Sequence, residues 1–466
     1  MAAAAAGANE EEPYRAHCIF IPYPLIGHIN PMLQFAKRLR HKSVRVTFLL
    51  SKFVAKIAPL SSDAGISAAT YSDGFDDGPP PGVSVNELIH RFLETVPPNL
   101  KESVQTVVGS SGPPVACVVY DSILTAALDV AADLGIAAAA FFTQSCAVDQ
   151  IFHEVYLGNV GVPFSGDEEE ILIPGLPALT PADLPSFVCG SGYGQYPPIF
   201  EMLVDQFQAV GKAQWLFFNT FYQLENKVID YMEKLSLPVK AIGPAIPSMH
   251  LDKRLSGDRD YGLNMYAPAT ATCLDWLSRR DPNSVVYVSF GSLAQLGPDQ
   301  MEELAWGLKL SGRHFLWVVR LAEQSKLPEG FTQSENGLVV PWGPQLDILG
   351  HVATACFITH CGWNSTLEAL SLGVPVVAMP QWTDQPTNAK YIKDMWGTGV
   401  RVVAGENGVV GRNTVAECVK EATESEEMKR NATKWKELAR EAMDEGGSSD
   451  TSIEEFVAAL AAEGSI

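Results

Sequence analysis

Short apolar runs alternate with longer amphipathic segments along most of the 466-residue chain. In the first half, residues 17–22, 45–50, 115–120 and 137–142 have the length and composition of buried strands, and a helical pattern such as that of residues 123–135 follows such a run. A strand that returns to its own sheet through a helix runs parallel to its predecessor, and the crossover is right-handed. The pattern therefore predicts an α/β protein built on doubly wound parallel sheets.

A second series of the same kind starts near residue 284, after a polar stretch without periodicity. A chain of this length exceeds what one hydrophobic core usually serves. We therefore expect an N-terminal domain over residues 17–247, a linker over residues 248–270 and a C-terminal domain over residues 271–446. Two doubly wound domains imply a cleft between them, with ligands at the carboxyl ends of the strands.

The two ends of the chain lie outside this repeated pattern. Residues 1–16 combine an alanine run with glutamates and lack the basic region of a secretory signal, so we expect a disordered lead-in. Residues 447–466 have a helical pattern, and we expect this helix to pack back on the N-terminal domain.

Charge and cysteine usage narrow the class of protein. The formal net charge of −21 argues against nucleic acid and anionic membranes as partners, although a local site can still bind one small anion. No apolar run approaches the roughly 18 residues of a membrane span. The eight cysteines are scattered and form no C-x-x-C pair, which predicts reduced thiols and a cytoplasmic protein.

Chemically reactive side chains gather in the stretch CFITHCGWNSTLEAL, residues 356–370. An apolar strand ends at Thr359, His360 and Cys361 follow, and a helical pattern begins a few residues later. A metal site would need further ligands, and no partner motif is visible. A nucleophilic cysteine would need a base and a lowered pKa, and nothing in the sequence singles out such a partner.

A cradle for an anion is the third interpretation of this turn. Gly362 permits close approach of the backbone, and a helix starting near Asn364 or Ser365 would point free N–H groups and its positive dipole end into the cleft. The plain structural alternative is a capping box between Ser365 and Glu368. On this turn alone, the two interpretations stay open.

A longer pattern surrounds the turn, with VVPWGPQLDILGH upstream and PVVAMPQWTDQPTNAK downstream. Read in one piece, it resembles the signature box of plant family 1 UDP-glycosyltransferases, the plant secondary-product glycosyltransferase box. The likeness extends to PYPLIGHINPMLQFAKRL, FFTQSCAV, FFNTFYQLE, VSFGSL and EGGSSDTSIEEFVAAL, and so covers nearly the whole chain. The box positions present are Trp342, Gln345, His360, Trp363, Asn364, Ser365, Glu368, Asp384 and Gln385.

The resemblance implies a GT-B fold, in which two Rossmann-like domains face each other, and an inverting glucosyl transfer that needs no metal or cofactor and uses UDP-glucose as co-substrate. Trp342 is then expected to stack on uracil, and Glu368 to accept hydrogen bonds from the ribose hydroxyls. The backbone near Gly343 would pair with the base edge. Gly343 stands where relatives often carry cysteine or alanine.

The resemblance assigns the remaining donor contacts to phosphate and sugar. His360 is expected to face the diphosphate, Asp384 and Gln385 to bind sugar hydroxyls, and Thr143 to reach the primary hydroxyl. The complete set of implied donor-site residues is Gly27, Thr143, Ser292, Trp342, Gly343, Gln345, His360, Gly362, Trp363, Asn364, Ser365, Glu368, Asp384 and Gln385.

The resemblance also places the catalytic pair. An acceptor hydroxyl is a poor nucleophile at neutral pH, so a base must remove its proton during attack. His28, in the turn after the first strand, is the implied base. Asp121, at the end of a later strand, is expected to bind the imidazole and fix its tautomer.

Loops of the N-terminal domain are expected to bind a lipophilic plant metabolite, which suits apolar walls. The likeness is strongest to members acting on carboxylates and on terpenoid or steroid hydroxyls. Those relatives often carry a bulky aromatic residue at the position of Ala126, so we expect a widened pocket. The candidate acceptor residues are Tyr23, Phe75, Leu124, Ala126, Phe142, Cys146, Phe187 and Phe200.

Three other activities compete with this interpretation. An NAD-dependent oxidoreductase would carry G-x-G-x-x-G after the first strand, where this chain has PYPLIGH. A sugar-nucleotide epimerase would lack the signature box, and a UDP-sugar-binding protein without catalysis would not need both His28 and Asp121. We expect a monomer that binds a UDP-sugar and a small-molecule acceptor.

Overall fold

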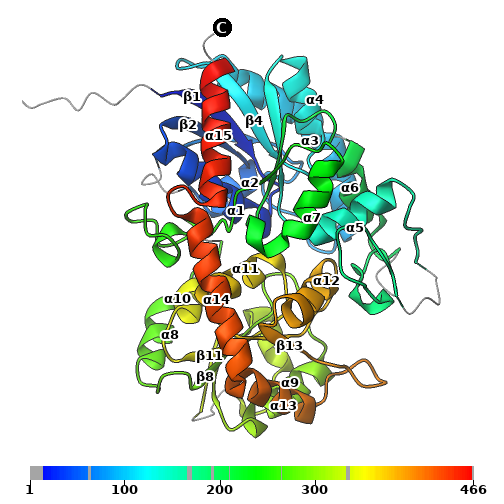
Figure 1. Cartoon of the computed structure of the whole chain (residues 1–466), viewed down its shortest axis with the longest axis vertical. Helices are drawn as coiled ribbons and strands as arrows, with labels where there is room; N and C mark the ends of the chain where they lie inside the picture. The colour runs from blue at the N-terminus through cyan, green and yellow to red at the C-terminus, as the bar shows by residue number, and fades with distance from the viewer. Residues whose placement is uncertain are drawn as a thin grey trace, which may run out of the picture.

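The computed structural model describes residues 14–60, 65–164, 170–189, 194–208, 210–263, 265–331 and 336–463. Within these residues the chain forms two parallel sheets, one above the other in Figure 1, as expected for an α/β protein with two facing Rossmann-like domains. Most of the predicted disordered lead, residues 1–13, falls outside the described part.

The N-terminal sheet has the strand order β3-β2-β1-β4-β5-β6-β7, and its paired strands are parallel. Three of these strands, β3, β6 and β7, are not among the apolar runs named from the sequence. The strands are β1 (Ala16–Ile21), β2 (Val44–Ser51), β3 (Ser67–Tyr71), β4 (Val115–Asp121), β5 (Ala137–Phe142), β6 (Trp215–Phe218) and β7 (Val239–Ala241).

The helices of this half are α1 (Ile26–His41), α2 (Lys52–Ile57), α3 (Val85–Val108), α4 (Ala126–Asp133), α5 (Cys146–Tyr156), α6 (Pro197–Asp205) and α7 (Tyr222–Lys234). Single turns occur at η2 (Pro181–Asp183), η4 (Gln206–Gln208) and η5 (Ser248–His250).

The C-terminal sheet has the order β10-β9-β8-β11-β12-β13 and is also parallel. Its strands are β8 (Val285–Ser289), β9 (His314–Val318), β10 (Gly337–Val340), β11 (Thr354–Thr359), β12 (Val376–Ala378) and β13 (Gly399–Arg401). Its helical segments are α8 (Thr270–Leu277), α9 (Pro298–Leu310), η6 (Leu321–Lys326), α10 (Gln345–Leu349), α11 (Trp363–Leu372), α12 (Gln385–Lys390), η8 (Tyr391–Met395) and α13 (Arg412–Glu424).

Side chains alternate across each strand, so a sheet buried on both faces needs apolar residues at consecutive positions. Strand β8 shows this directly. Val285 and Tyr287 belong to a core that also contains N-terminal-domain residues, whereas Val286 and Val288 belong to a core beneath α9 and α13. The continuous apolar runs in the sequence therefore correspond to doubly covered strands.

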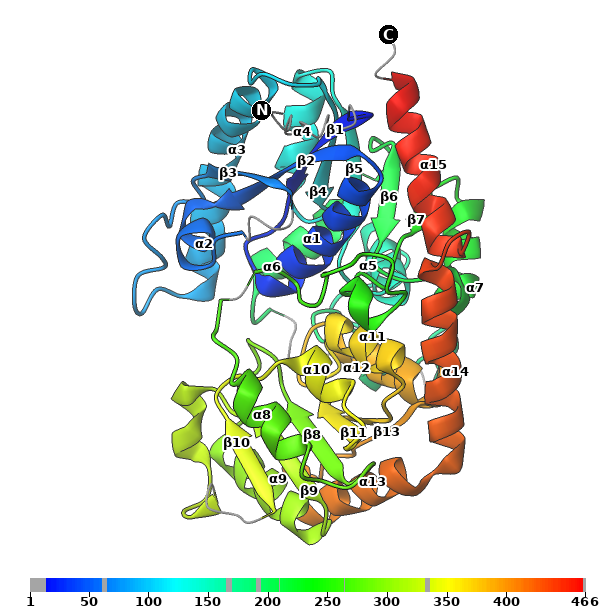
Figure 2. The ribbon, with the colours of Figure 1, turned by 90° about the vertical axis from the view of Figure 1, so that its left-hand side faces the viewer.

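The last two helices, α14 (Glu426–Met443) and α15 (Ser448–Glu463), run one after the other along both domains (Figures 1 and 2). Helix α15 contacts β1, β4 and β7 of the N-terminal sheet. The ring of Phe456 lies 4.8 Å from that of Phe217, and the Ser449 hydroxyl donates to the Gly243 carbonyl at 2.6 Å. The chain thus crosses between the domains twice.

The chain also crosses between the domains in the segment that follows η5, and side chains of α1 bind this segment. The Arg38 guanidinium donates to Asp252 at 2.8 Å, and the Lys37 ammonium donates to Asp258 at 2.7 Å. Among the described residues, no helix is long and apolar enough to cross a membrane.

Candidate active site

A cavity of about 810 Å³ lies between the two domains and is lined by residues of both. It includes residues that follow β1, β4 and β5 of the N-terminal sheet and β8, β11 and β12 of the C-terminal sheet. Each sheet reverses its strand order at one pair of strands, β1 beside β4 and β8 beside β11. Residues after both pairs line the cavity, where α/β folds bind ligands.

The N-terminal reversal point carries a histidine–aspartate pair. His28 Nδ1 lies 2.7 Å from Asp121 Oδ2, with the aspartate fully buried and the histidine side chain 23% exposed. An ionised carboxylate only accepts hydrogen bonds, so Nδ1 carries the proton and Nε2 keeps a free lone pair. The backbone N–H groups of Tyr23 and Ile123 also approach the carboxylate, each at 3.4 Å. The pair can therefore accept a proton at Nε2.

His28 lies in the first turn of α1, rather than in the turn between the first strand and this helix. Proline has no N–H and cannot donate to the carbonyl four residues earlier, which here is that of Gly27. The Asn364 amide, from the other domain, donates to this carbonyl at 2.7 Å. A helix bond that proline removes is thus replaced by a contact that ties the His28 turn to the C-terminal domain.

The C-terminal reversal point holds a neutral histidine between two glycines. Burial lowers the pKa of His360 to about 4, so the imidazole is uncharged at neutral pH. A Cβ on Gly291 would lie 2.8 Å from its ring, and one on Gly362 would lie 2.6 Å from Nε2. Both positions therefore require glycine, and the ring is confined to the wall of the cavity.

Helix α11 begins at Trp363, one or two residues earlier than predicted, and its N-cap Gly362 makes no side-chain capping bond. The capping box between Ser365 and Glu368 is absent, because the Ser365 hydroxyl accepts from Gln345 and Glu368 turns toward other partners. The first N–H groups of the helix are left without side-chain caps beside the cavity, an arrangement suited to an anion.

Cys361 is fully buried in this turn, and burial raises the pKa of its thiol. Its φ of 65° is a left-handed conformation that a non-glycine residue adopts only at a cost of roughly 1–3 kcal/mol. The Asn388 amide donates to its carbonyl at 3.0 Å. A protonated, enclosed thiol argues against a nucleophile, and the described residues contain no group of three or more His, Cys, Asp or Glu that could hold a metal.

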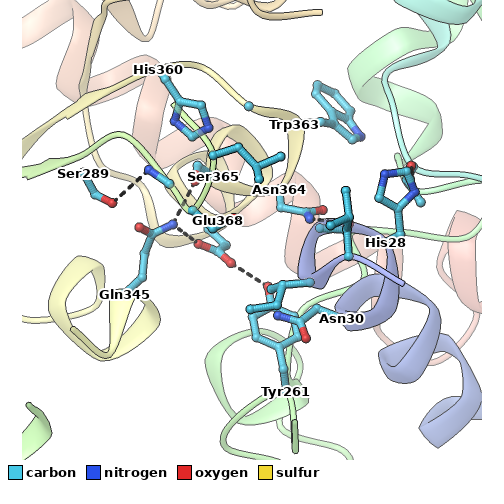
Figure 3. Close-up of a pocket in the computed structure, with 18 of the residues that line it drawn as sticks. His28, Asn30, Tyr261, Ser289, Gln345, His360, Trp363, Asn364, Ser365 and Glu368 are labelled. Carbon is cyan, nitrogen blue, oxygen red and sulfur yellow. Dashed lines mark hydrogen bonds between the residues drawn. The ribbon is translucent and has the colours of Figure 1, made fainter. Parts of the chain in front are cut away.

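Glu368 is the acidic centre of a hydrogen-bond network on the C-terminal side (Figure 3). Gln345 donates to one carboxylate oxygen at 2.6 Å, and the Tyr261 hydroxyl donates to the other at 2.6 Å. Burial raises the pKa of Glu368, and these two hydrogen bonds oppose that rise. The carboxylate is held in place with lone pairs left for vicinal hydroxyls.

The aromatic ring of Trp342 also lines the cavity, and the ring of Tyr266 lies 4.6 Å from it. Tyr266 and Tyr261 both belong to the segment between the domains, which the sequence predicts only as a linker. Gly343 lines the cavity too, and a Cβ there would meet Ile348 at 3.0 Å. The wall can stack on a flat ring and bind two hydroxyls a short distance away.

Asp384 and Gln385 lie at the start of α12, and both are buried. Two backbone N–H groups, of Gln381 and Trp382, donate to the Gln385 side-chain oxygen at 2.8 and 3.0 Å. This fixes the amide so that its nitrogen is the free end. Burial raises the pKa of Asp384, whose carboxylate accepts from Thr383 at 2.8 Å and from Asn388 at 2.7 Å.

Some of the predicted donor-site residues contact other protein groups in this structure. The Thr143 hydroxyl lies 3.2 Å from His28 Nδ1. The indole N–H of Trp363 donates across the domain interface to the Asn219 carbonyl at 2.7 Å. Asn364 binds Gly27 in the same way, so these two residues join the domains. All fourteen predicted donor-site residues line the cavity: Gly27, Thr143, Ser292, Trp342, Gly343, Gln345, His360, Gly362, Trp363, Asn364, Ser365, Glu368, Asp384 and Gln385.

Of the eight candidate acceptor residues, only Tyr23 and Phe187 line the cavity within the described part of the chain. Phe142 stacks on Phe218 at 4.4 Å inside the N-terminal core. Phe75 lies under Arg91 in a separate surface hollow. An apolar residue near a strand end can face either the core or a cavity, and the other six candidates do not line this cavity: Phe75, Leu124, Ala126, Phe142, Cys146 and Phe200.

The apolar wall comes instead from α6 and the turn after it. Ile199, Met202, Leu203 and Gln206 line the cavity at spacings of three, four and seven residues, which is one helical face. Phe200 is on another face of the same helix. The periodicity is present in the sequence, but it lies in a proline- and glycine-rich region that gave no clear helix signal. Tyr261 and Asp149 also line the cavity and were not predicted.

Comparisons with known proteins agree with this geometry. The family model described as "UDP-glucoronosyl and UDP-glucosyl transferase" matches residues 265–442. UDP-glycosyltransferase 74E2 of Arabidopsis thaliana is 46% identical over 449 residues, covering 95% of this chain and 98% of the relative. Mogroside I-E synthase of Siraitia grosvenorii is 43% identical over 451 residues, with 95% and 98% covered.

A solved structure matches both domains. The crystal structure of Os79 from O. sativa in complex with UDP superimposes with a TM-score of 0.88 at 37% identity, covering 95% of this chain and 100% of that one. The same rice protein has been solved with U2F and trichothecene, and that structure superimposes with a TM-score of 0.85 at 36% identity.

Proposed function

The chain belongs to the plant family 1 UDP-glycosyltransferases and is a glycosyltransferase with the GT-B fold, and from this premise we propose that it transfers glucose from UDP-glucose to a lipophilic plant metabolite with inversion. The single observation that supports the proposal most strongly is the His28–Asp121 pair facing the uncapped start of α11 across one cavity. One side can take a proton while the other holds a diphosphate.

The transfer is a single displacement. The acceptor hydroxyl gives its proton to His28 Nε2 while its oxygen bonds to the anomeric carbon. The bond from that carbon to the diphosphate oxygen breaks, and its electron pair leaves with UDP. The imidazolium that forms is stabilised by Asp121, 2.7 Å from Nδ1. Attack opposite the leaving group converts the α-linked donor into a β-glucoside.

Charge on the departing UDP is balanced by hydrogen-bond donors of the C-terminal domain. These are the free N–H groups at the start of α11, an imidazole N–H of His360, and the turn at Ser292. Such donors stabilise a developing negative charge without reorganising. We propose that they do so without a metal ion and that the protein needs no cofactor.

The nucleoside and sugar contacts follow the network around Glu368. The uracil stacks on Trp342, the ribose hydroxyls donate to Glu368, and the hexose hydroxyls bind Asp384 and the free amide nitrogen of Gln385. The fixed orientation of that amide leaves its nitrogen free to donate to a hexose hydroxyl. Two of the relatives are named as a mogroside synthase and a flavonol glucosyltransferase, which supports a polycyclic acceptor.

The test is a screen of plant metabolites with UDP-glucose as donor, followed by product mass and the anomeric coupling constant in the proton NMR spectrum. We expect a mass gain of one hexose, a β-anomer, and the same rate with and without a chelator. An α-anomer would overturn the inverting mechanism. Loss of activity in the chelator that magnesium restores would overturn the metal-independent one.

A further inference from the structure

Asp149 is a buried carboxyl group in the wall of the cavity with an unpaired oxygen. It is the fourth residue of α5, it is one of the residues that line the cavity, and it is 1% exposed. Among the described residues, its Oδ2 has no hydrogen-bond partner. Burying a polar atom without a partner costs free energy, so the residue calls for an explanation.

Asp149 is not needed to cap its helix. The N–H groups of Cys146 and Ala147 donate to Glu225 at 3.1 and 3.0 Å, and that of Val148 donates to the Ser145 hydroxyl at 3.3 Å. The donors of the first turn are therefore satisfied by other side chains. A structural role at the helix N-terminus does not account for the aspartate.

The surroundings of Asp149 favour its uncharged form. Burial raises the pKa of its carboxyl well above the usual range, and the nearby carboxylates of Glu225, Asp384 and Asp121 raise it further. The first is on α7, the second precedes α12, and the third ends β4. A neutral carboxylic acid has an O–H to donate as well as an oxygen that accepts.

Asp149 lies between the part of the cavity that we propose binds the sugar and the apolar wall formed by α6. Helix α5 packs against α12 on the sugar side and against α6, whose Ile199, Met202 and Leu203 line the cavity. The nearby Asp121 orients the proposed base. A molecule with its reacting hydroxyl at His28 and its apolar body along α6 therefore passes close to Asp149.

We propose that Asp149 hydrogen-bonds an uncharged hydroxyl or carbonyl oxygen of the acceptor, other than the oxygen that is glucosylated. The inference rests on the proposed glucosyl transfer and deepens it. This hydrogen bond favours lipophilic acceptors that carry a second neutral oxygen. A carboxylate of the acceptor is disfavoured beside Asp149, because three other carboxyl groups lie nearby.

The test compares two steroid probes, one with two hydroxyl groups and one with the same skeleton and a single hydroxyl. For the wild type we expect kcat/KM to be about tenfold or more higher for the diol, the value of one hydrogen bond to a buried polar group. Asp149→Leu should abolish this preference by raising the KM for the diol. Asp149→Asn, which keeps a neutral donor, should retain most of it.

Asp129 offers a matched control, since it is the fourth residue of α4 as Asp149 is of α5, but it is exposed. Asp129→Leu should leave the preference unchanged. Asp149→Leu should not lower the melting temperature, because it removes an unpaired buried group. Asp149→Ala gives a second measurement of the preference if the leucine is too large for the site.

Several results would overturn the inference. One is a wild-type enzyme that treats both probes alike, and another is an equal loss for both probes in Asp149→Leu. A third is a rise in the KM for UDP-glucose, which would assign Asp149 to the sugar, and a fourth is an asparagine variant as impaired as the leucine variant. If the wild type glucosylates no acceptor at all, the proposed function itself fails, and that outcome is distinct from transfer without the expected preference.

Discussion

The two reversal points of the molecule share a topology and differ in charge. At the first point, where β1 lies beside β4, His28 borders the cavity and the fully buried Asp121 binds its ring. At the second point, where β8 lies beside β11, the wall offers neutral hydrogen-bond donors, which are His360, kept uncharged by burial, and the free N–H groups at the start of α11. The same crossover of parallel strands therefore supports proton transfer in one domain and anion binding in the other.

The contrast between the two reversal points shows what proton transfer and anion binding each require. A base must gain and lose a proton, so it needs a group that titrates and a partner that stabilises its charged form. A diphosphate site that stays constant while a proton moves nearby is better built from donors that do not titrate. Asn364 of the second region binds the Gly27 carbonyl of the first, so the two regions are also mechanically joined.

After removal of the base itself, the largest expected effect comes from Asp121, the buried partner of His28. In Asp121→Asn an amide can donate to His28 Nδ1, which moves the imidazole proton to Nε2 and removes the base. We expect kcat to fall about 10²- to 10³-fold with little change in the KM for UDP-glucose. Steady-state UDP release measures both. A variant whose main defect is in the KM for the donor would contradict the division of tasks between the two regions.

The next largest effect concerns Glu368, the carboxylate on α11 in the second region. In Glu368→Ala the ribose loses charge-assisted hydrogen bonds worth about 1.5–3 kcal/mol, so the KM for UDP-glucose should rise about 10- to 100-fold. Isothermal titration with UDP gives the same change as an affinity. Glu368→Gln serves as the control, and its KM for UDP-glucose should lie between those of the wild type and Glu368→Ala. A fall in kcat without a change in UDP affinity would contradict the assignment of Glu368 to the ribose.

The protonation of His360 should appear in the pH dependence of folding. Its folded pKa of about 4 lies below the unfolded value of 6.5, so the unfolded chain binds the proton first and stability falls as pH drops from 6.5 toward 4. Between pH 7 and pH 5 the loss from this group should be about 2 kcal/mol. Denaturant unfolding of the wild type and of His360→Asn at pH 7 and pH 5 measures it, and between these two values the wild type should lose about 2 kcal/mol more stability than the variant.

The smallest effect is expected at the contact that joins the two regions. Asn364→Ala removes the donor to the Gly27 carbonyl, which cannot find a replacement because Pro31 lacks an N–H. One hydrogen bond of about 1 kcal/mol corresponds to a roughly fivefold change, and we expect it in kcat through the placement of His28. If UDP affinity falls instead, Asn364 acts mainly on the diphosphate.

Much of this architecture could be predicted from local patterns. The continuous apolar runs predict doubly covered parallel strands, and the box from Trp342 to Gln385 predicts residues that line one side of the cavity, because short sequence spacings fix which side chains follow one turn. His28 and Asp121 were predicted through family likeness, and the strand order that brings their turns together follows from the β1–β4 pairing.

The remaining features depend on contacts between distant segments. The role of Asn364 at Gly27 needs both domains in place, and the bond from Tyr261 to Glu368 needs the path of the linker. The burial of Phe142 and the isolation of Asp149 depend on which face of an element meets a cavity, and neither periodicity nor composition determines that.

The central claim is that His28 moves the proton and contributes nothing to holding UDP. It is tested most directly by measuring kcat and UDP affinity in His28→Ala, with calorimetry for binding and UDP release for turnover. The account predicts a fall in kcat of about 10³-fold or more and a UDP dissociation constant within about twofold of the wild type. A turnover within tenfold of the wild type, or a loss of UDP binding that matches the loss of turnover, would contradict it.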